Sequence, residues 1–536
     1  MHDPALAAEA LADLPADIAD SPLFNADLAP VPQARRNWST YNFAALWISM
    51  AHCIPTYMLA SGLIAAGMNW WQALITILVG NTIVLLPILA NSHPGTKYGI
   101  PFPVFARASY GVFGANVPAI MRALVACGWF GINTWIGGQA LQTFFKALWS
   151  GWPTLLGPLT DPASSWAFGG HYPTEWISFA LFWGLNILIV YRGMDIVRRF
   201  ENIAAPYVLV MTALLVTWAI WRAHGLGAVM RDEGKFHTLA QFWPVFVPSV
   251  TAMIGFWSTL SLNMPDFTRF GRSQKEQAIG QVVALPTTMT VFALMGIVIT
   301  SASAEIYGKP IWDPVELVGM FPSRLLVAVS MFTVVVATLG VNIAANVVSP
   351  ANDFANIKPG SISFKTGGLI TGVVGVLMVP WKLIADPSGY IFKWLLGYSG
   401  GLGSIAGVLV ADYWFVRRAQ LRLADLYRRD GEYAYGVRTG TVTETTAGNA
   451  EGEGLYRDGA IPSRERARYS GPGINGKAIG ATLFGCTLAW IGLIVEPLAF
   501  LYDYAWFVGA GGAGAAYALL MLPERRRLES ITSSKL

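Results

Sequence analysis

The chain has 536 residues, of which 54% are hydrophobic and 13% are charged, and its mean hydropathy is +0.47. This composition is typical of an integral membrane protein and excludes a chain whose surface faces mostly water. The net charge of +4 does not indicate nucleic-acid binding, because the basic residues lie beside apolar segments. The three cysteines are too far apart to predict a metal knuckle or a disulfide framework.

Apolar runs of about 20 residues are needed to cross the hydrocarbon of a bilayer. Residues 1–34 contain neither such a run nor any Lys or Arg, so they are predicted to be a mobile acidic cytoplasmic tail and not a secretory signal. Twelve transmembrane helices are predicted after this tail, and Pro380 and Lys382 shorten the ninth. They cover residues 42–66, 70–90, 117–147, 174–191, 202–222, 243–264, 278–300, 324–348, 366–384, 388–415, 476–496 and 500–522.

The first predicted span contains a break. His52, Cys53 and Pro55 place an imidazole, a thiol and a proline at the middle of the membrane. A proline removes one intrahelical hydrogen bond and disturbs the preceding turn. Backbone groups that are freed at this depth need partners within the protein or in a wet cavity. An interrupted helix at mid-membrane is typical of a span that contacts a transported substrate.

The sixth predicted span is interrupted in a similar way, between Trp257 and Pro265. Helices one and six therefore carry matching breaks in two groups of five helices. Because five is odd, the second group must be inverted relative to the first, and paired breaks predict a substrate site where the two groups meet. The predicted fold is an all-α membrane protein with a five-plus-five inverted-repeat core, broken helices 1 and 6, and two C-terminal helices.

Basic residues in the loops predict the orientation of the chain. Loop 150–174 contains no Lys or Arg, whereas the loops on the other side contain many. The positive-inside rule therefore predicts that both termini are cytoplasmic and that the protein lies in the inner or plasma membrane. The predicted parts are a cytoplasmic tail (1–40), a first repeat (41–222), a second repeat (243–415), a loose, flexible cytoplasmic loop (416–475), two further helices (476–522) and a C-terminal tail (523–536).

Polar and aromatic residues within the predicted spans indicate the kind of ligand. Trp129 and Asn133 lie four residues apart on one face of the third helix, Trp257 lies beside the sixth-helix break, and Asn346 follows Asn342 by one turn. Packing between helices is the competing interpretation for each of them. Two indoles can enclose a flat ring, and stacking contributes about 1–3 kcal/mol per ring. Amides can both donate to and accept from the C(=O)–NH edge of an imide or ureide, so the group favours a planar, neutral heterocycle.

Five longer stretches carry a family resemblance. They are Asn25-Ala-Asp-Leu-Ala-Pro, Asn91-Ser-His-Pro-Gly-Thr-Lys-Tyr-Gly-Ile-Pro-Phe-Pro-Val, Gly128-Trp-Phe-Gly-Ile-Asn, Ser261-Leu-Asn-Met-Pro-Asp-Phe-Thr-Arg and Asn342-Ile-Ala-Ala-Asn. Together they resemble the nucleobase:cation symporter-1 family, whose members transport hydantoins, allantoin, uracil, cytosine and related rings. The resemblance implies an inverted-repeat core with two extra helices that works by alternating access.

The same resemblance implies roles for single residues. Trp129 and Trp257 resemble the two tryptophans that enclose the ring, and Asn346 matches an asparagine that contacts the ligand. Asn133 stands where allantoin carriers have Asn and sodium-coupled hydantoin carriers have Gln. Cys53 departs from the family pattern, since similar members have Gln or Asn at this substrate-contacting position, and a thiol replaces that polar contact.

The coupling ion is the second departure from the family. The resemblance implies that hydroxyl groups of helix eight help to bind sodium, but the corresponding residues here are Gly340 and Val341. Sodium prefers oxygen ligands, as hard cations do, so transport is predicted to be coupled to protons or uncoupled. His52 is a candidate proton carrier because histidine titrates near neutral pH, and a neutral, hydrogen-bonded histidine is the alternative. Asp266 is predicted either to join Arg269 in a cytoplasmic gate or to cap a helix.

These observations predict a secondary active transporter that imports an allantoin-, hydantoin- or uracil-like heterocycle. A transporter-like sensor that binds the same ligands without moving them is the alternative. A membrane-embedded enzyme is a further rival, but it would need convergent ionisable groups at depth, and His52 alone does not supply them. The expected partners are the heterocyclic substrate, a co-transported proton and the lipid bilayer. We expect no cofactor, metal, nucleic acid or obligate protein partner.

Overall fold

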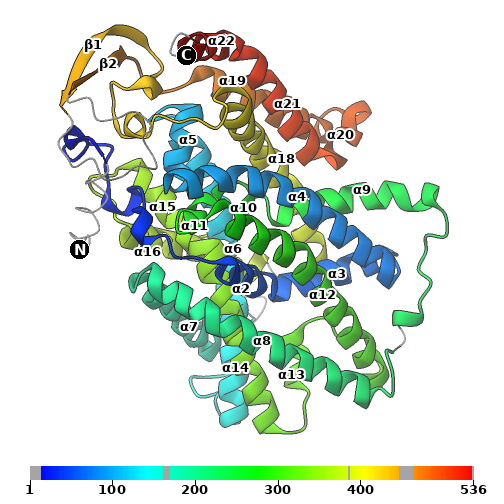
Figure 1. Cartoon of the computed structure of the whole chain (residues 1–536). Coiled ribbons are helices and arrows are strands. Elements are labelled where there is room, and N and C mark those ends of the chain that lie inside the picture. The colour runs from blue at the N-terminus through cyan, green and yellow to red at the C-terminus, as the bar shows by residue number, and fades with distance from the viewer. Residues whose placement is uncertain (1–13, 161–169, 228, 384–386, 446–462, 534–536) are drawn as a thin grey trace.

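The chain folds into a bundle of long apolar helices (Figure 1). The computed structural model describes residues 14–160, 170–227, 229–383, 387–445 and 463–533. Within these ranges nine helices are long and apolar enough to cross a membrane, and the number rises to eleven if each of two bent helix pairs counts as one span. The predicted all-α, multi-spanning class is confirmed, while the count of twelve helices and the inverted repeat stay predictions.

The elements follow one another along three stretches of chain. The first stretch comprises α2 (Thr40–Ala51), α3 (Ile54–Ala65), α4 (Trp70–Tyr98), α5 (Phe102–Tyr110), α6 (Asn116–Leu148), α7 (Pro173–Tyr191) and α8 (Met194–Arg222). The second comprises α9 (Leu239–Phe256), α10 (Leu260–Asn263), α11 (Pro265–Thr268), α12 (Gln274–Tyr307), α13 (Pro314–Gly319), α14 (Arg324–Val341), the π-helical η5 (Asn342–Val347), α15 (Val348–Ile357), α16 (Phe364–Leu377), α17 (Pro380–Leu383), α18 (Pro387–Val410) and the π-helical η6 (Ala411–Val416). The third comprises β1 (Val437–Thr445), β2 (Ser463–Ser470), α19 (Gly476–Trp490), α20 (Ala499–Asp503), α21 (Ala505–Leu520) and α22 (Leu522–Ser533).

Two helices of the first stretch are longer than the apolar pattern predicts. α4 continues past residue 90 to Tyr98, and α8 begins at Met194 although its apolar run starts at 202. The polar end of α4 is mostly buried against neighbouring elements, whereas Asp195 and Arg199 at the start of α8 are exposed. In α4, for example, the Asn91 side chain donates to the carbonyl oxygen of Ser261 at 2.7 Å. Helix length here follows burial of polar groups with partners, which a hydropathy window does not detect.

From residue 14 onward the N-terminal segment packs against the bundle, which corrects the prediction of a mobile tail for that part, and residues 1–13 of the predicted tail lie outside the described residues. The amide of Asn25 donates to the carbonyl oxygens of Pro359 and Ile362 at 2.7 and 2.9 Å. Apolar side chains of the segment share a cluster with α5 and with the chain that follows η6. Those that are buried include Leu14, Ile18, Leu23 and Leu28. An apolar residue every four or five positions therefore anchors a segment whose composition suggests mobility.

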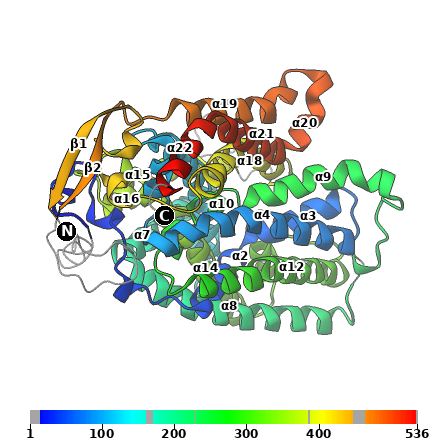
Figure 2. The same cartoon turned by 45° about the horizontal axis from the view of Figure 1, so that its top comes forward.

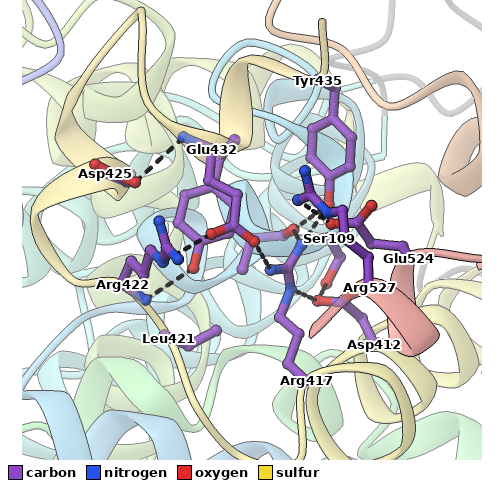
Figure 3. Close-up of polar contacts among 12 residues, drawn as sticks. Ser109, Asp412, Arg417, Leu421, Arg422, Asp425, Glu432, Tyr435, Glu524 and Arg527 are labelled. Carbon is purple, nitrogen blue, oxygen red and sulfur yellow. Dashed lines mark hydrogen bonds and ion pairs between the residues drawn. The ribbon is translucent and has the colours of Figure 1, made fainter. Parts of the chain in front are cut away.

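A buried group of charges holds the chain after η6 (Figure 3), and we call it the Arg417 cluster: Asp412, Arg417, Glu432 and Tyr435. Arg417 donates to Asp412 at 2.8 Å, to Glu432 at 3.0 Å and to the Tyr435 hydroxyl at 2.8 Å. Burial acts to lower the pKa of Arg417, but the negative groups around it, led by Asp412, hold that pKa well above its usual value. The first part of the predicted loose loop is thus fixed by ion pairs, because its charges face inward.

A β-hairpin follows the Arg417 cluster and also corrects the prediction of a flexible loop. β1 and β2 pair antiparallel, with Val437 opposite Ser470. The run from Thr439 is poor in apolar residues, but threonine and valine favour strands, and backbone pairing needs no apolar face. Residues 446–462 of the predicted loop lie outside the described residues. The hairpin and the N-terminal segment lie at the same end of the molecule (Figure 2).

Candidate functional site

The break in the first span lies at His52 and Cys53, which separate α2 from α3, and the two helices are bent by 58°. Pro55 lies in the first turn of α3, where its missing N–H leaves no helical hydrogen bond unmade. The carbonyl oxygen of Ala51, which the break frees, accepts a hydrogen bond from the Thr56 hydroxyl at 2.7 Å. The predicted break is confirmed, and the proline begins the second half of the span instead of bending a continuous helix.

The sixth span breaks at residues 257–259, which separate α9 from the four-residue helix α10. The Ser258 hydroxyl donates to the carbonyl oxygen of Ile254 at 3.0 Å and so provides a partner beside the interruption. Trp257 packs edge to face against Trp47 of α2, with 5.2 Å between ring centroids. The second predicted break is therefore confirmed, and it lies against the helix that leads into the first.

The structure brings both predicted indoles to the sixth-helix break, with Phe256 between them. Trp129 of α6 meets Phe256 at 5.4 Å between centroids, and Phe256 meets Trp257 at 4.9 Å, both nearly edge to face. Trp129 Nε1 donates to the Tyr398 hydroxyl at 3.2 Å, and that hydroxyl donates to the carbonyl of Gly255 at 2.9 Å. Trp257 Nε1 is buried without a hydrogen-bond partner in the described part of the chain. The two indoles are thus neighbours of one ring but do not stack face to face.

The predicted amides lie on α6 and η5, and Asn342 links these two elements without contacting Asn133. Asn133 donates to the carbonyl oxygen of Trp129 at 3.1 Å, and its own Oδ1 is buried without a partner among the described residues. Asn346 donates to Asn342 Oδ1 at 3.0 Å, and Asn342 donates to the Thr134 hydroxyl of α6 at 3.1 Å. A π-helical turn such as η5 often marks a functional position in a helix. This turn joins the eighth span to α6 at Thr134.

His52 and Cys53 both find partners at the first break. His52 Nε2 lies 2.5 Å from Thr212 Oγ1 of α8 and 3.3 Å from the Tyr57 hydroxyl. Cys53 Sγ lies 3.3 Å from Thr56 Oγ1. Both residues are buried. This arrangement fits the alternative interpretation of His52, in which a hydrogen-bonded imidazole stabilises the interruption.

Asp266 lies in α11, apart from the indoles and amides. Its Oδ1 accepts hydrogen bonds from the backbone N–H of Phe102 at 3.1 Å and from the Asn352 side chain at 3.0 Å. Arg269, the predicted gate partner, donates to the carbonyl oxygen of Asp27 at 2.9 Å. Capping of α5 fits these hydrogen bonds, and Arg269 also lies close enough to Asp266 for the two charges to interact, so the gate stays a prediction.

Three residues at these breaks were not predicted from the sequence. Phe256 directly precedes Trp257, so an aromatic pair beside a break was the available signal. Tyr398 lies within an apolar run that offers no motif. Glu201 fell one residue outside the predicted fifth span, and the longer α8 brings it into the membrane region, where it is 2% exposed.

A helical, multi-spanning protein with matching interruptions in two spans, and with buried amides and indoles beside them, has the architecture of a membrane permease. Over residues 30–452 the chain matches the family described as permeases for cytosine/purines, uracil, thiamine and allantoin. The chain belongs to this family, which confirms the resemblance seen in the sequence.

Individual relatives and solved structures agree with this membership. The chain is 40% identical over 501 residues to the allantoin permease of Bacillus subtilis (strain 168), and 93% of each chain is covered. It is 40% identical over 435 residues to the purine-uracil permease of Arabidopsis thaliana, which covers 80% of this chain and 71% of that relative. The fold is similar to that of Mhp1, a nucleobase-cation-symport-1 family transporter solved in a closed conformation with bromovinylhydantoin bound. The TM-score is 0.70 at 24% identity, and 95% of this chain and 96% of Mhp1 are covered.

Proposed function

We propose that the chain is a secondary transporter that imports a flat nucleobase-like or ureide heterocycle, of the allantoin, hydantoin or uracil class, by alternating access. The observation that carries the proposal is the group of buried indoles and amides beside two interrupted spans. Membership of a permease family and 40% identity to an allantoin permease over 93% of both chains support the ligand class.

In this proposal Trp129 and Trp257 contribute the faces that stack on the ring, and Asn133, Asn346 and Cys53 contact its polar edge. None of these side chains carries a charge, which suits a neutral ligand. The buried Oδ1 of Asn133 has no partner among the described residues, so a ligand N–H has an acceptor to bind. Amides buried in this way discriminate against rings that lack the matching edge, because the amides would then stay unpaired.

In this proposal Phe256 moves when the ring enters, because this side chain packs edge to face against both indoles. The residues on either side belong to the interruption between α9 and α10. Few helical hydrogen bonds need to break when such a segment moves, so the interruption is a suitable hinge. Alternating access would use this movement to open and close the site.

The proposed driving ion is the proton and not sodium. Gly340 and Val341, the positions that would have to supply hydroxyl ligands, have none, and an ideal Cβ on Gly340 would lie 2.3 Å from Ser49 Oγ. Sodium would therefore lose oxygen ligands on which a hard cation depends. We assign positioning roles to His52, which holds the first break against α8, and to Asp266, which caps α5. We also propose two repeats (41–222 and 243–415) and cytoplasmic termini.

The proposal is tested by uptake into proteoliposomes that contain the full chain. Labelled allantoin, hydantoin, uracil and cytosine are offered separately, with an inward proton gradient and with sodium varied at constant pH. We expect accumulation of at least one of the first three ligands under the proton gradient, without sodium. Sodium-dependent uptake would refute the coupling, and binding without uptake of any ligand would favour the sensor.

A further inference from the structure

A buried carboxyl group lies where three membrane helices meet. Glu201 of α8 is 2% exposed, and neither of its carboxylate oxygens has a hydrogen-bond partner among the described residues. The Ser49 hydroxyl of α2 faces this carboxyl group. Gly340 of α14 forms the opposite wall, since an ideal Cβ there would lie 3.3 Å from Glu201 Oε2. α8 packs against both α2 and α14 (Figure 1).

The missing side chain at position 340 makes room for this carboxyl group. Any side chain on Gly340 would meet both Ser49 Oγ, at 2.3 Å, and the carboxylate. The three residues therefore form one small polar site inside the bundle. It lies at the residue where the resemblance predicted a hydroxyl group.

A carboxylate that faces only one neutral hydroxyl group in the described part of the chain, that of Ser49, and no positive charge is unstable at such a place. Moving an ionised carboxylate into an apolar environment costs several kcal/mol or more unless it is paired, whereas the neutral acid is tolerated far better. Ionisable residues inside membrane spans commonly mark ion or proton pathways. Glu201 is therefore expected to carry a proton whenever the helices close around it as they do here.

None of the other described charged groups on the helices around Glu201 interacts with its carboxyl group, and several of them have other partners. On α8, Arg198 lies one turn away and donates to Asn37. On α12, Glu276 pairs with Arg272, and on α7, Glu175 pairs with His171. The remaining titratable or charged side chains on α8 and on the four helices packed against it are Tyr41 and His52 near α2, Arg324 on α14, Lys275, Glu305 and Tyr307 on α12, Tyr191 on α7, and Asp195, Arg199, Tyr207 and Arg222 on α8. Among the described residues, none of these supplies a charge to the Glu201 carboxyl group.

Two residues of the polar site formed by Ser49, Glu201 and Gly340 lie close in the chain to two parts of the proposed substrate site, the first break and η5. Ser49 precedes Ala51, the last residue of α2 before the first break, by two positions. Gly340 precedes Asn342, the amide that links η5 to α6, by two positions. A change in the charge of Glu201 therefore acts on the contact between α2 and α14, and both helices lead directly into the substrate-binding region.

We propose that Glu201 is the proton-binding site that couples transport to the proton gradient. With the substrate site open to the outside, the Glu201 carboxylate takes one proton from water, and the neutral acid lets α2, α8 and α14 close. With the site open to the cytoplasm, the acid returns that proton to water. Glu201 lies seven residues after Met194, or about 10 Å along α8 from its start at 1.5 Å per residue, so the release path is short. This inference rests on the proposed function.

The test compares the full-length wild type with Glu201→Gln in proteoliposomes. Glutamine keeps the shape of the neutral acid but cannot release a proton. The probe is labelled allantoin, hydantoin or uracil, whichever the wild type accumulates. An inward gradient of about two pH units supports up to about 100-fold accumulation for one proton per ligand, because each unit is tenfold. We expect Glu201→Gln to equilibrate the ligand without accumulating it, and to retain counterflow that no longer depends on pH.

Three controls make the result decisive. Glu305→Gln is the same change at an exposed carboxylate that pairs with Arg231, and it should accumulate ligand as the wild type does. Glu201→Asp keeps a titratable group and should keep part of the accumulation, while the counterflow retained by Glu201→Gln shows that the Gln variant is folded. His52→Asn removes the rival imidazole and also its contact with Thr212 of α8, so its overall rate can fall, but the uptake that it retains should still depend on the proton gradient.

The outcomes separate this inference from the proposed function. A wild type that accumulates none of the ligands, or that needs sodium, overturns the proposed function and this inference with it. A wild type driven by protons together with a Glu201→Gln variant that accumulates ligand equally overturns the assignment of Glu201 alone. Loss of accumulation in His52→Asn but not in Glu201→Gln would transfer the coupling role to the imidazole.

Discussion

Replacing Trp257 tests the proposed ring face at the sixth-helix break. Its indole packs edge to face against Trp47 at 5.2 Å and against Phe256 at 4.9 Å, and its Nε1 has no partner among the described residues. Trp257→Phe therefore keeps an aromatic face and breaks no internal hydrogen bond. Trp257→Ala removes the face, and stacking of about 1–3 kcal/mol corresponds to a Kd that rises about 5- to 150-fold.

Ligand binding to purified protein, measured by calorimetry with allantoin, hydantoin and uracil, provides the assay. The Phe variant should bind more tightly than the Ala variant, and a thermal melt of each shows whether it is folded. Trp243→Ala, at a tryptophan of α9 that is 56% exposed, is the matched control and should bind as the wild type does. A folded Trp257→Ala protein with wild-type affinity would refute the placement of the ring.

Further predictions concern the amides, the coupling ion and the Arg417 cluster. Asn346→Ala should raise the Kd by about 5- to 150-fold, the equivalent of about 1–3 kcal/mol for a lost buried hydrogen bond, and an unchanged Kd in calorimetry would contradict its role. Replacing sodium by choline at constant pH should leave initial uptake rates unchanged, and a collapse of uptake would contradict proton coupling. Arg417→Met leaves buried carboxylates unpaired and should cost about 3–5 kcal/mol of stability. Arg418→Met breaks only the exposed pair with Glu529 and should cost about 0–1 kcal/mol, so equal melting temperatures for the two variants would contradict the structural role of the cluster.

The sequence predicted the membrane class and the two breaks because both leave strong local signals. His52 and Pro55 interrupt an apolar run, and Trp257 precedes a second proline in the matching helix. The family motifs added the pairing of Trp129 with Trp257. The contact of Phe256 with both indoles could not be predicted, since it depends on how Trp129 of α6 meets the end of α9 and not on local pattern.

The described parts of the segments predicted to be flexible from their low apolar content are ordered in the structure. The N-terminal segment and residues 417–436 are polar or sparsely apolar. Hydrogen bonds from the Asn25 side chain hold the first of them, and the Arg417 cluster holds the second. Charge counts do not reveal which charges face each other. Glu201 fell one residue outside the predicted fifth span (202–222), and its burial depends on α8 starting at Met194.

Counterflow of labelled allantoin, hydantoin or uracil into proteoliposomes preloaded with the same unlabelled ligand tests the central claim most directly. The measurement needs no ion gradient, so it asks only whether the site at the two breaks opens alternately to each side. We predict transient accumulation of label by the wild type, and little or none by a folded Trp257→Ala variant. Binding of these ligands by the wild type without any exchange across the membrane would contradict a transporter.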